Sequence, residues 1–167
     1  MHETPKQYTR RVLGYIEGED PVRILGTTPG RIARLIRGVP KKRLALRAIP
    51  DKWSVAEILA HLADTELLYG FRVRRILEAN GAPIQGIDQD AWAGFSDYAK
   101  QDPALSLEAF RATRERLVRL LRSLPKKRWT LWGMHSERGK ETLTRTVEML
   151  AGHDINHLMQ IKARLPK

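Results

Sequence analysis

Three histidines have the types and spacing that a divalent metal site needs. His153 and His157 are four residues apart in a segment with helical periodicity, so their imidazoles lie about 40° apart around the axis and one turn apart along it. His61 lies on the apolar stripe of a second long helical segment and can supply a third nitrogen from across a bundle. Three imidazole ligands at about 2 Å leave a coordination position open. We predict a divalent metal ion on these histidines.

The spacing alone leaves a second interpretation open. A His-x-x-x-His pair in a soluble helix can equally be two hydrogen-bonded bundle residues, although burial on an apolar stripe favours a bound ion because unpaired polar groups are costly to bury. The pair is not a zinc-protease motif, since Asp154 follows His153 and no glutamate stands between the histidines. No general acid or base is identifiable.

Polar neighbours could orient the imidazoles through hydrogen bonds. The candidates are Asp64, Asp154, Asn156 and Gln160. Of the remaining histidines, His2 is terminal and His135 lies in a loop, so both are predicted to be exposed, with His135 able to border the site.

The charge of the chain suggests a different partner. Thirty Lys and Arg against nineteen Asp and Glu give a net charge of +11. The basic residues are dispersed apart from two clusters, Lys41-Lys42-Arg43 and Lys126-Lys127-Arg128. Dispersed charge is typical of a solvated surface, and the sequence has no helix-turn-helix or aromatic RNA-binding motif, so nucleic acid is an alternative partner rather than the first choice.

Composition excludes several classes of protein. The absence of cysteine removes disulfide frameworks, thiolate metal sites and a cysteine nucleophile. The first five residues lack the features of a signal peptide, and no apolar run approaches the length of a membrane span. We expect a cytoplasmic protein with no membrane partner.

Helical periodicity predicts one all-α domain over residues 1–167. Helix starts are marked by Asp20-Pro21, by Asp102-Pro103 and by the capping box Ser54-Val55-Ala56-Glu57. A further helical stretch over 21–37 is expected to be kinked or split at Thr28-Pro29-Gly30, and a short helix is expected over 7–17. The three longest helices are predicted over residues 54–81, 103–125 and 142–165.

Two segments resemble the DinB/YfiT-like proteins. They read DKWSVAEILAHLAD over 51–64 and HDINHLMQI over 153–161. In that family a Trp-Ser pair opens the second helix of a four-helix bundle, and a histidine of that helix joins a His-x-x-x-His pair of the fourth. The matching positions are Trp53-Ser54, His61, His153 and His157. The resemblance implies a four-helix bundle with a short N-terminal helical extension.

The same resemblance carries expectations about chemistry. It implies zinc or nickel, a homodimer, and a small-molecule substrate handled with a low-molecular-weight thiol, since characterised members include thiol S-transferases and a mycothiol-dependent isomerase. Some members have a further polar group four residues after the first histidine; this chain departs from them with Thr65, so the resemblance does not imply a fourth ligand there. We therefore expect a metal-dependent transferase or hydrolase that activates water or a thiol. A non-catalytic metal-binding bundle and a basic nucleic-acid-binding protein are the alternatives.

Overall fold

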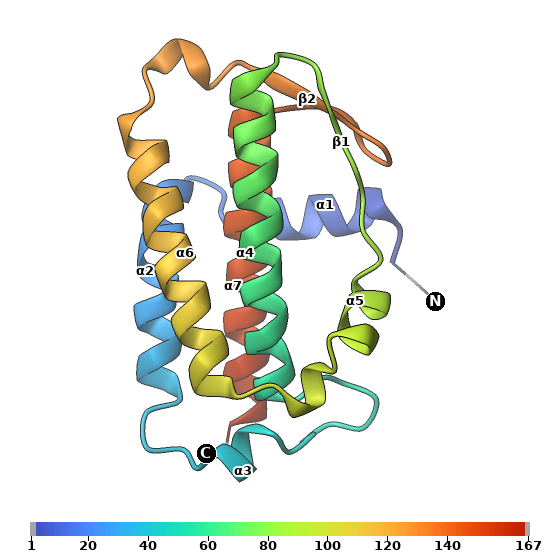
Figure 1. Ribbon diagram of the computed structural model, residues 1–167, viewed down its shortest axis with the longest axis vertical. Coiled ribbons are helices and arrows are strands. Elements are labelled where there is room, and N and C mark those ends of the chain that lie inside the picture. Colours follow the sequence, from blue (N-terminus) through green and yellow to red (C-terminus); the bar gives the residue numbers. More distant parts are fainter. Residues whose placement is uncertain (1–2, 166–167) are drawn as a thin grey trace.

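Four long helices build the molecule in the computed structural model, which describes residues 3–165 (Figure 1). Helix α4 contacts α6 and α7, and α2 contacts the same two helices from the opposite corner. The pairing of α4 with α7 brings the two histidine-bearing segments together. The helices span Pro21–Leu35 (α2), Val55–Glu78 (α4), Pro103–Ser123 (α6) and Leu143–Arg164 (α7).

Three of the four long helices begin at the residues that the sequence marks. Ser54 caps α4 with a complete capping box, in which the Glu57 carboxylate accepts from the Ser54 N–H at 2.7 Å. Asp20 and Asp102 cap α2 and α6 ahead of their prolines. A cap of this kind contributes about 1 kcal/mol, and it fixes where the helical periodicity starts. Because the start of α4 is fixed, so is the face on which His61 lies.

Helix α2 runs through Pro29 as one helix, so the predicted split at Thr28-Pro29-Gly30 is wrong. Proline has no N–H to donate to the carbonyl of Leu25, four residues earlier. That carbonyl instead accepts from Nη1 of Arg114, on α6, at 3.1 Å. A tertiary hydrogen bond therefore replaces the helical one that the proline removes.

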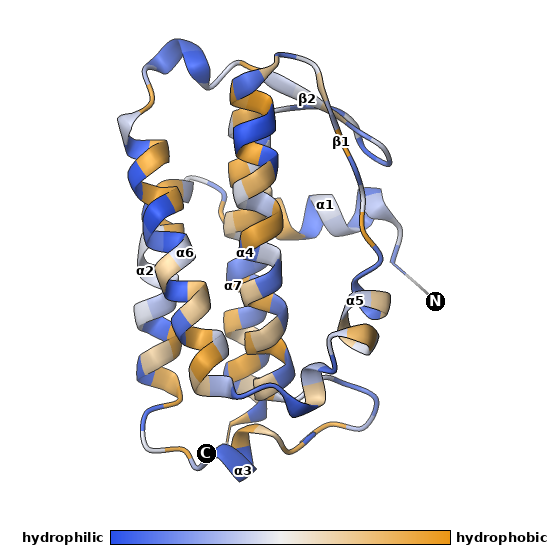
Figure 2. Cartoon of the chain, viewed as in Figure 1, coloured by the Kyte–Doolittle hydropathy of each residue, from blue (hydrophilic) through white to orange (hydrophobic). Residues whose placement is uncertain are grey.

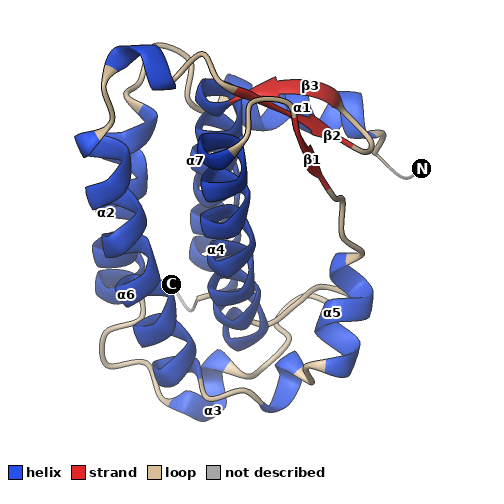
Figure 3. Cartoon of the chain, turned by 45° about the horizontal axis from the view of Figure 1, so that its top comes forward, coloured by secondary structure: helices blue, strands red, loops and turns tan. Residues whose placement is uncertain are grey.

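Shorter elements cover one side and the two ends of the bundle (Figure 3). A three-stranded sheet stands beside α1, with β2 parallel to β1 and antiparallel to β3. The sequence did not predict this sheet, because strands of three or four residues are too short to show an alternating pattern. The short elements are α1 (Pro5–Gly14), α3 (Lys41–Leu44), β1 (Ala82–Ile84), α5 (Gln89–Phe95), η1 (Tyr98–Lys100), η2 (Lys126–Arg128), β2 (Trp132–His135) and β3 (Gly139–Thr142).

Each long helix carries both apolar and polar residues, and the apolar side chains that face inward fill the interior of the bundle (Figure 2). Helix α1 lies across α7, and Gly152 permits the close approach, because a Cβ there would stand 2.2 Å from the Val12 carbonyl oxygen. This contact seats α1 beside the neighbouring His153. No helix within residues 3–165 is long and apolar enough to cross a membrane.

Candidate metal centre

The three predicted histidines converge between α4 and α7. Nε2 of His153 lies 2.9 Å from Nε2 of His61 and 3.1 Å from Nε2 of His157. One ligand atom from each residue lies within 4.8 Å of the others, and all three side chains are buried. Nitrogens around a tetrahedral zinc ion with bonds of about 2.0–2.1 Å are separated by roughly 3.3 Å. The cluster therefore has a size that one ion of this kind fits.

Electrostatics keep the imidazoles in the form that a metal requires. Burial lowers the pKa of His61 to about 4. Burial also lowers the pKa values of His153 and His157 well below the usual range, and repulsion within the cluster adds to the effect. Metal ions bind the neutral imidazole, so protonation does not compete with binding near neutral pH.

One of the predicted orienting residues contacts a histidine of the cluster. Oε1 of Gln160 lies 3.0 Å from Nδ1 of His157. An amide oxygen only accepts, so Nδ1 carries the proton and the lone pair of Nε2 is free to face the cluster. The other three candidates are engaged elsewhere: Asp64 accepts from Tyr98, Asn156 accepts from Arg11, and Asp154 pairs with Arg114.

The walls of the cluster come from α4 and the segment before it. The Trp53 ring packs against the His61 imidazole with centroids 4.9 Å apart. The Trp53 carbonyl accepts from Nε of Arg164 at 2.7 Å, which ties the end of α7 to the start of α4. Thr65, one turn after His61, holds its hydroxyl 3.4 Å from His61 Nε2.

A cavity of about 430 Å³ opens on the cluster from the side of α1 and the sheet. Its lining includes His61, Thr65 and His153, together with Tyr8 of α1. Cavities of a few hundred Å³ suit small molecules. The cluster therefore has access to a space in which a substrate could lie.

His135 corrects one expectation from the sequence. Its place in a predicted loop indicated an exposed residue, yet His135 is only 2% exposed and lines the same cavity as His61 and His153. It lies at the end of β2, in the sheet that periodicity did not reveal, and this explains the error. The expectation that it borders the site is correct. His2 lies outside the described residues.

Residues 24–161 match the family model of the DinB superfamily, a span that includes His61, His153 and His157. The chain belongs to the DinB superfamily. Relatives within it are distant in sequence. One of them carries the name putative metal-dependent hydrolase YfiT and comes from Bacillus subtilis. It is 23% identical to this chain over 142 residues, which cover 84% of this chain and 79% of YfiT. OB0413 of Oceanobacillus iheyensis, named in the same way, is 23% identical over 139 residues, covering 83% and 80%.

Solved structures show the DinB fold of this chain. YfiT from Bacillus subtilis, described as a probable metal-dependent hydrolase with an unusual four-helix bundle topology, superposes with a TM-score of 0.80 at 20% identity, over 96% of this chain and 87% of YfiT. The mycothiol-dependent maleylpyruvate isomerase superposes with a TM-score of 0.69 at 11% identity, over 84% of this chain and 59% of the isomerase. The predicted four-helix bundle is confirmed.

In this DinB bundle a buried charge cluster lies next to the histidines. Arg114 is 1% exposed, donates from Nη1 to Asp154 at 2.5 Å and donates from Nε to Glu66 at 2.8 Å. With the Leu25 carbonyl, these contacts join all four long helices. Asp154 follows His153 directly, and Glu66 lies five residues after His61, so the cluster fixes α7 against α4. The sequence signal for it was a lone arginine within the apolar stripe of α6.

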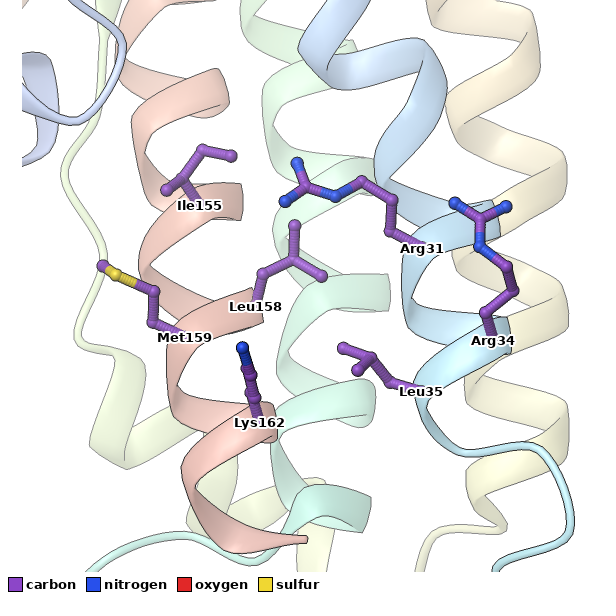
Figure 4. Close-up of a pocket in the computed structure, with 7 residues that line it drawn as sticks. All are labelled: Arg31, Arg34, Leu35, Ile155, Leu158, Met159 and Lys162. Atoms are coloured by element: carbon purple, nitrogen blue, oxygen red, sulfur yellow. The ribbon is translucent and has the colours of Figure 1, made fainter. Parts of the chain in front are cut away.

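The two basic clusters do not form one surface on this DinB domain. Lys41-Lys42-Arg43 begins α3 and Lys126-Lys127-Arg128 forms η2, and these segments lie at opposite ends of the bundle (Figures 1 and 2). A separate groove of about 490 Å³ runs between α2 and α7 (Figure 4). It carries the exposed cations Arg31, Arg34 and Lys162 but none of the histidines. This groove is therefore separate from the histidine cluster.

Proposed function

We propose that His61, His153 and His157 hold one zinc or nickel ion and that the protein is a metal-dependent hydrolase or thiol S-transferase. The observation that carries the proposal is the convergence of three buried imidazoles from two helices beside a cavity of small-molecule size. A bound divalent ion lowers the pKa of water or of a thiol at its open position. The names of the relatives, which refer to metal-dependent hydrolases, support the same class of chemistry.

The chain's own residues would bind the ion, orient its histidine ligands and cover the site. The imidazoles point at one another from adjacent helices, so little ordering entropy remains to be lost when an ion binds. Trp53 covers one side of His61, and the cavity receives the substrate on another. The mycothiol enzyme among the structural neighbours supports a thiol as co-substrate, and the absence of cysteine is compatible with sulfur that arrives from outside. The homodimer and the cytoplasmic location remain predictions.

Metal analysis of protein purified without a histidine tag tests the centre. We expect close to one zinc or nickel ion per chain, and added metal should raise the melting temperature of metal-free protein, since ligand at a hundred times its Kd stabilises by about 2.7 kcal/mol. Protein that contains no transition metal and does not respond to added zinc or nickel would refute the centre.

Turnover separates the possible activities. Wild-type protein loaded with metal is assayed with a low-molecular-weight thiol plus an electrophile, and with an ester in the absence of thiol, each alongside His157→Ala. Turnover that needs the thiol and is lost in the variant identifies a transferase, whereas loss of ester hydrolysis identifies a hydrolase. If neither assay distinguishes wild type from the variant, the catalytic part of the proposal fails and a non-catalytic metal protein is indicated.

Replacement of Gln160 by leucine should weaken metal binding. The variant removes the acceptor that fixes the His157 tautomer, and loss of such an outer partner typically costs 10–100-fold in metal affinity. Competition with a chromogenic chelator measures the change. Asn156→Leu is the matched control, because Asn156 lies on the same helix but bonds Arg11. Equal affinities for the two variants would show that Gln160 does not orient the ligand.

A further inference from the structure

The cavity beside the histidines contains a second buried arginine with an unusual environment. Arg72 is 5% exposed, yet its guanidinium makes no salt bridge to a carboxylate of residues 3–165, and its Nε has no hydrogen-bond partner there. Its Nη2 donates to the Gln85 carbonyl at 2.6 Å, and the Tyr69 ring lies 5.1 Å from its central carbon. Arg114, the other buried arginine described above, pairs with two carboxylates. A buried charge without a partner destabilises the folded protein, so an anion from outside the chain would be stabilised by binding at Arg72.

His135 supplies a second unpaired donor in the same cavity. Its Nδ1 accepts a hydrogen bond of 3.2 Å from the backbone N–H of Glu137. Because an N–H can only donate, Nδ1 is the unprotonated ring nitrogen. Burial and the nearby Arg138 and Arg72 lower the pKa of His135, so the ring is neutral and its proton sits on Nε2. That Nε2 is buried without a partner in the described residues. Both orphaned groups are therefore donors, which an acceptor anion would satisfy.

The remaining charges of the cavity are already balanced or exposed. Arg138 is held by Glu141 through two bonds of 2.6 and 2.9 Å. Glu3 pairs with Arg11, and Glu137 is exposed at the rim. The charge of the Arg72 guanidinium is therefore the one buried positive charge of the cavity lining that has no carboxylate partner among the described residues. A carboxylate matches this balance, because it brings one negative charge and two oxygens for the two free donors.

The position of Arg72 relates this anion to the histidine cluster. His61, Thr65, Leu68 and Arg72 follow one face of α4, and all four line the cavity. Arg72 lies eleven helical steps after His61, or roughly 16.5 Å along the axis. A ligand held at Arg72 thus extends from there toward the histidines.

We propose that Arg72 and His135 form the carboxylate-binding end of the substrate cavity, so that the substrate is a small carboxylic acid whose reacting group lies toward the three histidines. The assignment of a substrate class rests on the proposed function. The two donors can be tested for anion binding without any metal, so the two proposals can fail separately.

Titrations with hexanoate and with its neutral amide, hexanamide, test this end of the cavity. Binding is measured by NMR in wild type, Arg72→Met and Arg74→Met, each metal-free and zinc-loaded. The metal-free series removes direct coordination of the carboxylate to an ion. We expect wild type to prefer the acid over the amide by about 10–100-fold in both series, as for a charge-assisted hydrogen bond. Arg72→Met should lose this preference.

Arg74→Met is the matched control, since Arg74 is exposed two residues away on α4, and it should keep the preference. Without ligand, Arg72→Met should melt no lower than wild type, because it removes an uncompensated buried charge. Arg72→Lys and His135→Phe should each weaken the preference and extend the test if the methionine variant does not fold. Equal binding of acid and amide by wild type, or an unchanged preference in Arg72→Met, would overturn the proposal. So would displacement of hexanoate by an equal concentration of inorganic phosphate, which would indicate a phosphoryl site.

Discussion

Replacement of His153 by alanine is expected to abolish stoichiometric metal binding. His153 is the central member of the cluster, with its Nε2 2.9 Å from His61 and 3.1 Å from His157. The two imidazoles that remain come from different helices. The loss of affinity should exceed the 10–100-fold that removal of an outer partner costs. The metal content of purified protein and a chelator competition measure it, and added zinc should no longer raise the melting temperature of the variant.

His135→Phe is the control for this experiment. His135 is also a buried histidine of the cavity, but it lies outside the group of converging ligand atoms. This variant should retain one ion per chain with wild-type affinity. Retention of a full equivalent by His153→Ala, or its loss from His135→Phe, would show that the ion uses a different set of ligands.

Replacement of Arg114 by methionine should destabilise the protein by about 3–5 kcal/mol, the usual cost of removing one partner from a buried ion pair. Glu66 and Asp154 would be left in the interior without a counter-charge, and the Leu25 carbonyl would lose its donor. Burial already raises the pKa of Glu66, and Arg114 opposes that rise. For a chain of this size the melting temperature should fall by roughly 6–20 °C. Urea denaturation gives the free energy of unfolding.

Two further variants identify the cause of that loss. Pro29→Ala, added to Arg114→Met, restores an N–H that can donate to Leu25, and it should recover about 1 kcal/mol. Replacement of all three charged residues, as Arg114→Met with Glu66→Met and Asp154→Leu, should recover most of the stability, because no buried charge is left uncompensated. If the triple variant is as unstable as Arg114→Met, the packing of the arginine rather than its charge stabilises the bundle.

The sequence by itself determined the helices and the histidines on them. The starts of α2, α4 and α6 follow from Asp20, Ser54 and Asp102, because a cap acts on backbone groups within three residues. The pairing of His153 with His157 follows from the helical repeat in the same way. His61 follows from its position on the apolar stripe of α4, and the family resemblance added support for the three-histidine set and supplied the four-helix topology, which local periodicity could not give.

Only the tertiary structure decided which polar side chains meet. Asp154 adjoins His153 in sequence, but it bonds Arg114, forty residues away, because the side chains of neighbouring helical residues point in different directions. Pro29 does not interrupt α2, because Arg114 from another helix bonds the freed carbonyl. Arg72 and His135 come from a helix and from a strand too short to predict, and only the cavity between them shows that both donors are free. Hydrogen bonds and charges between distant segments depend on packing, and no local pattern encodes them.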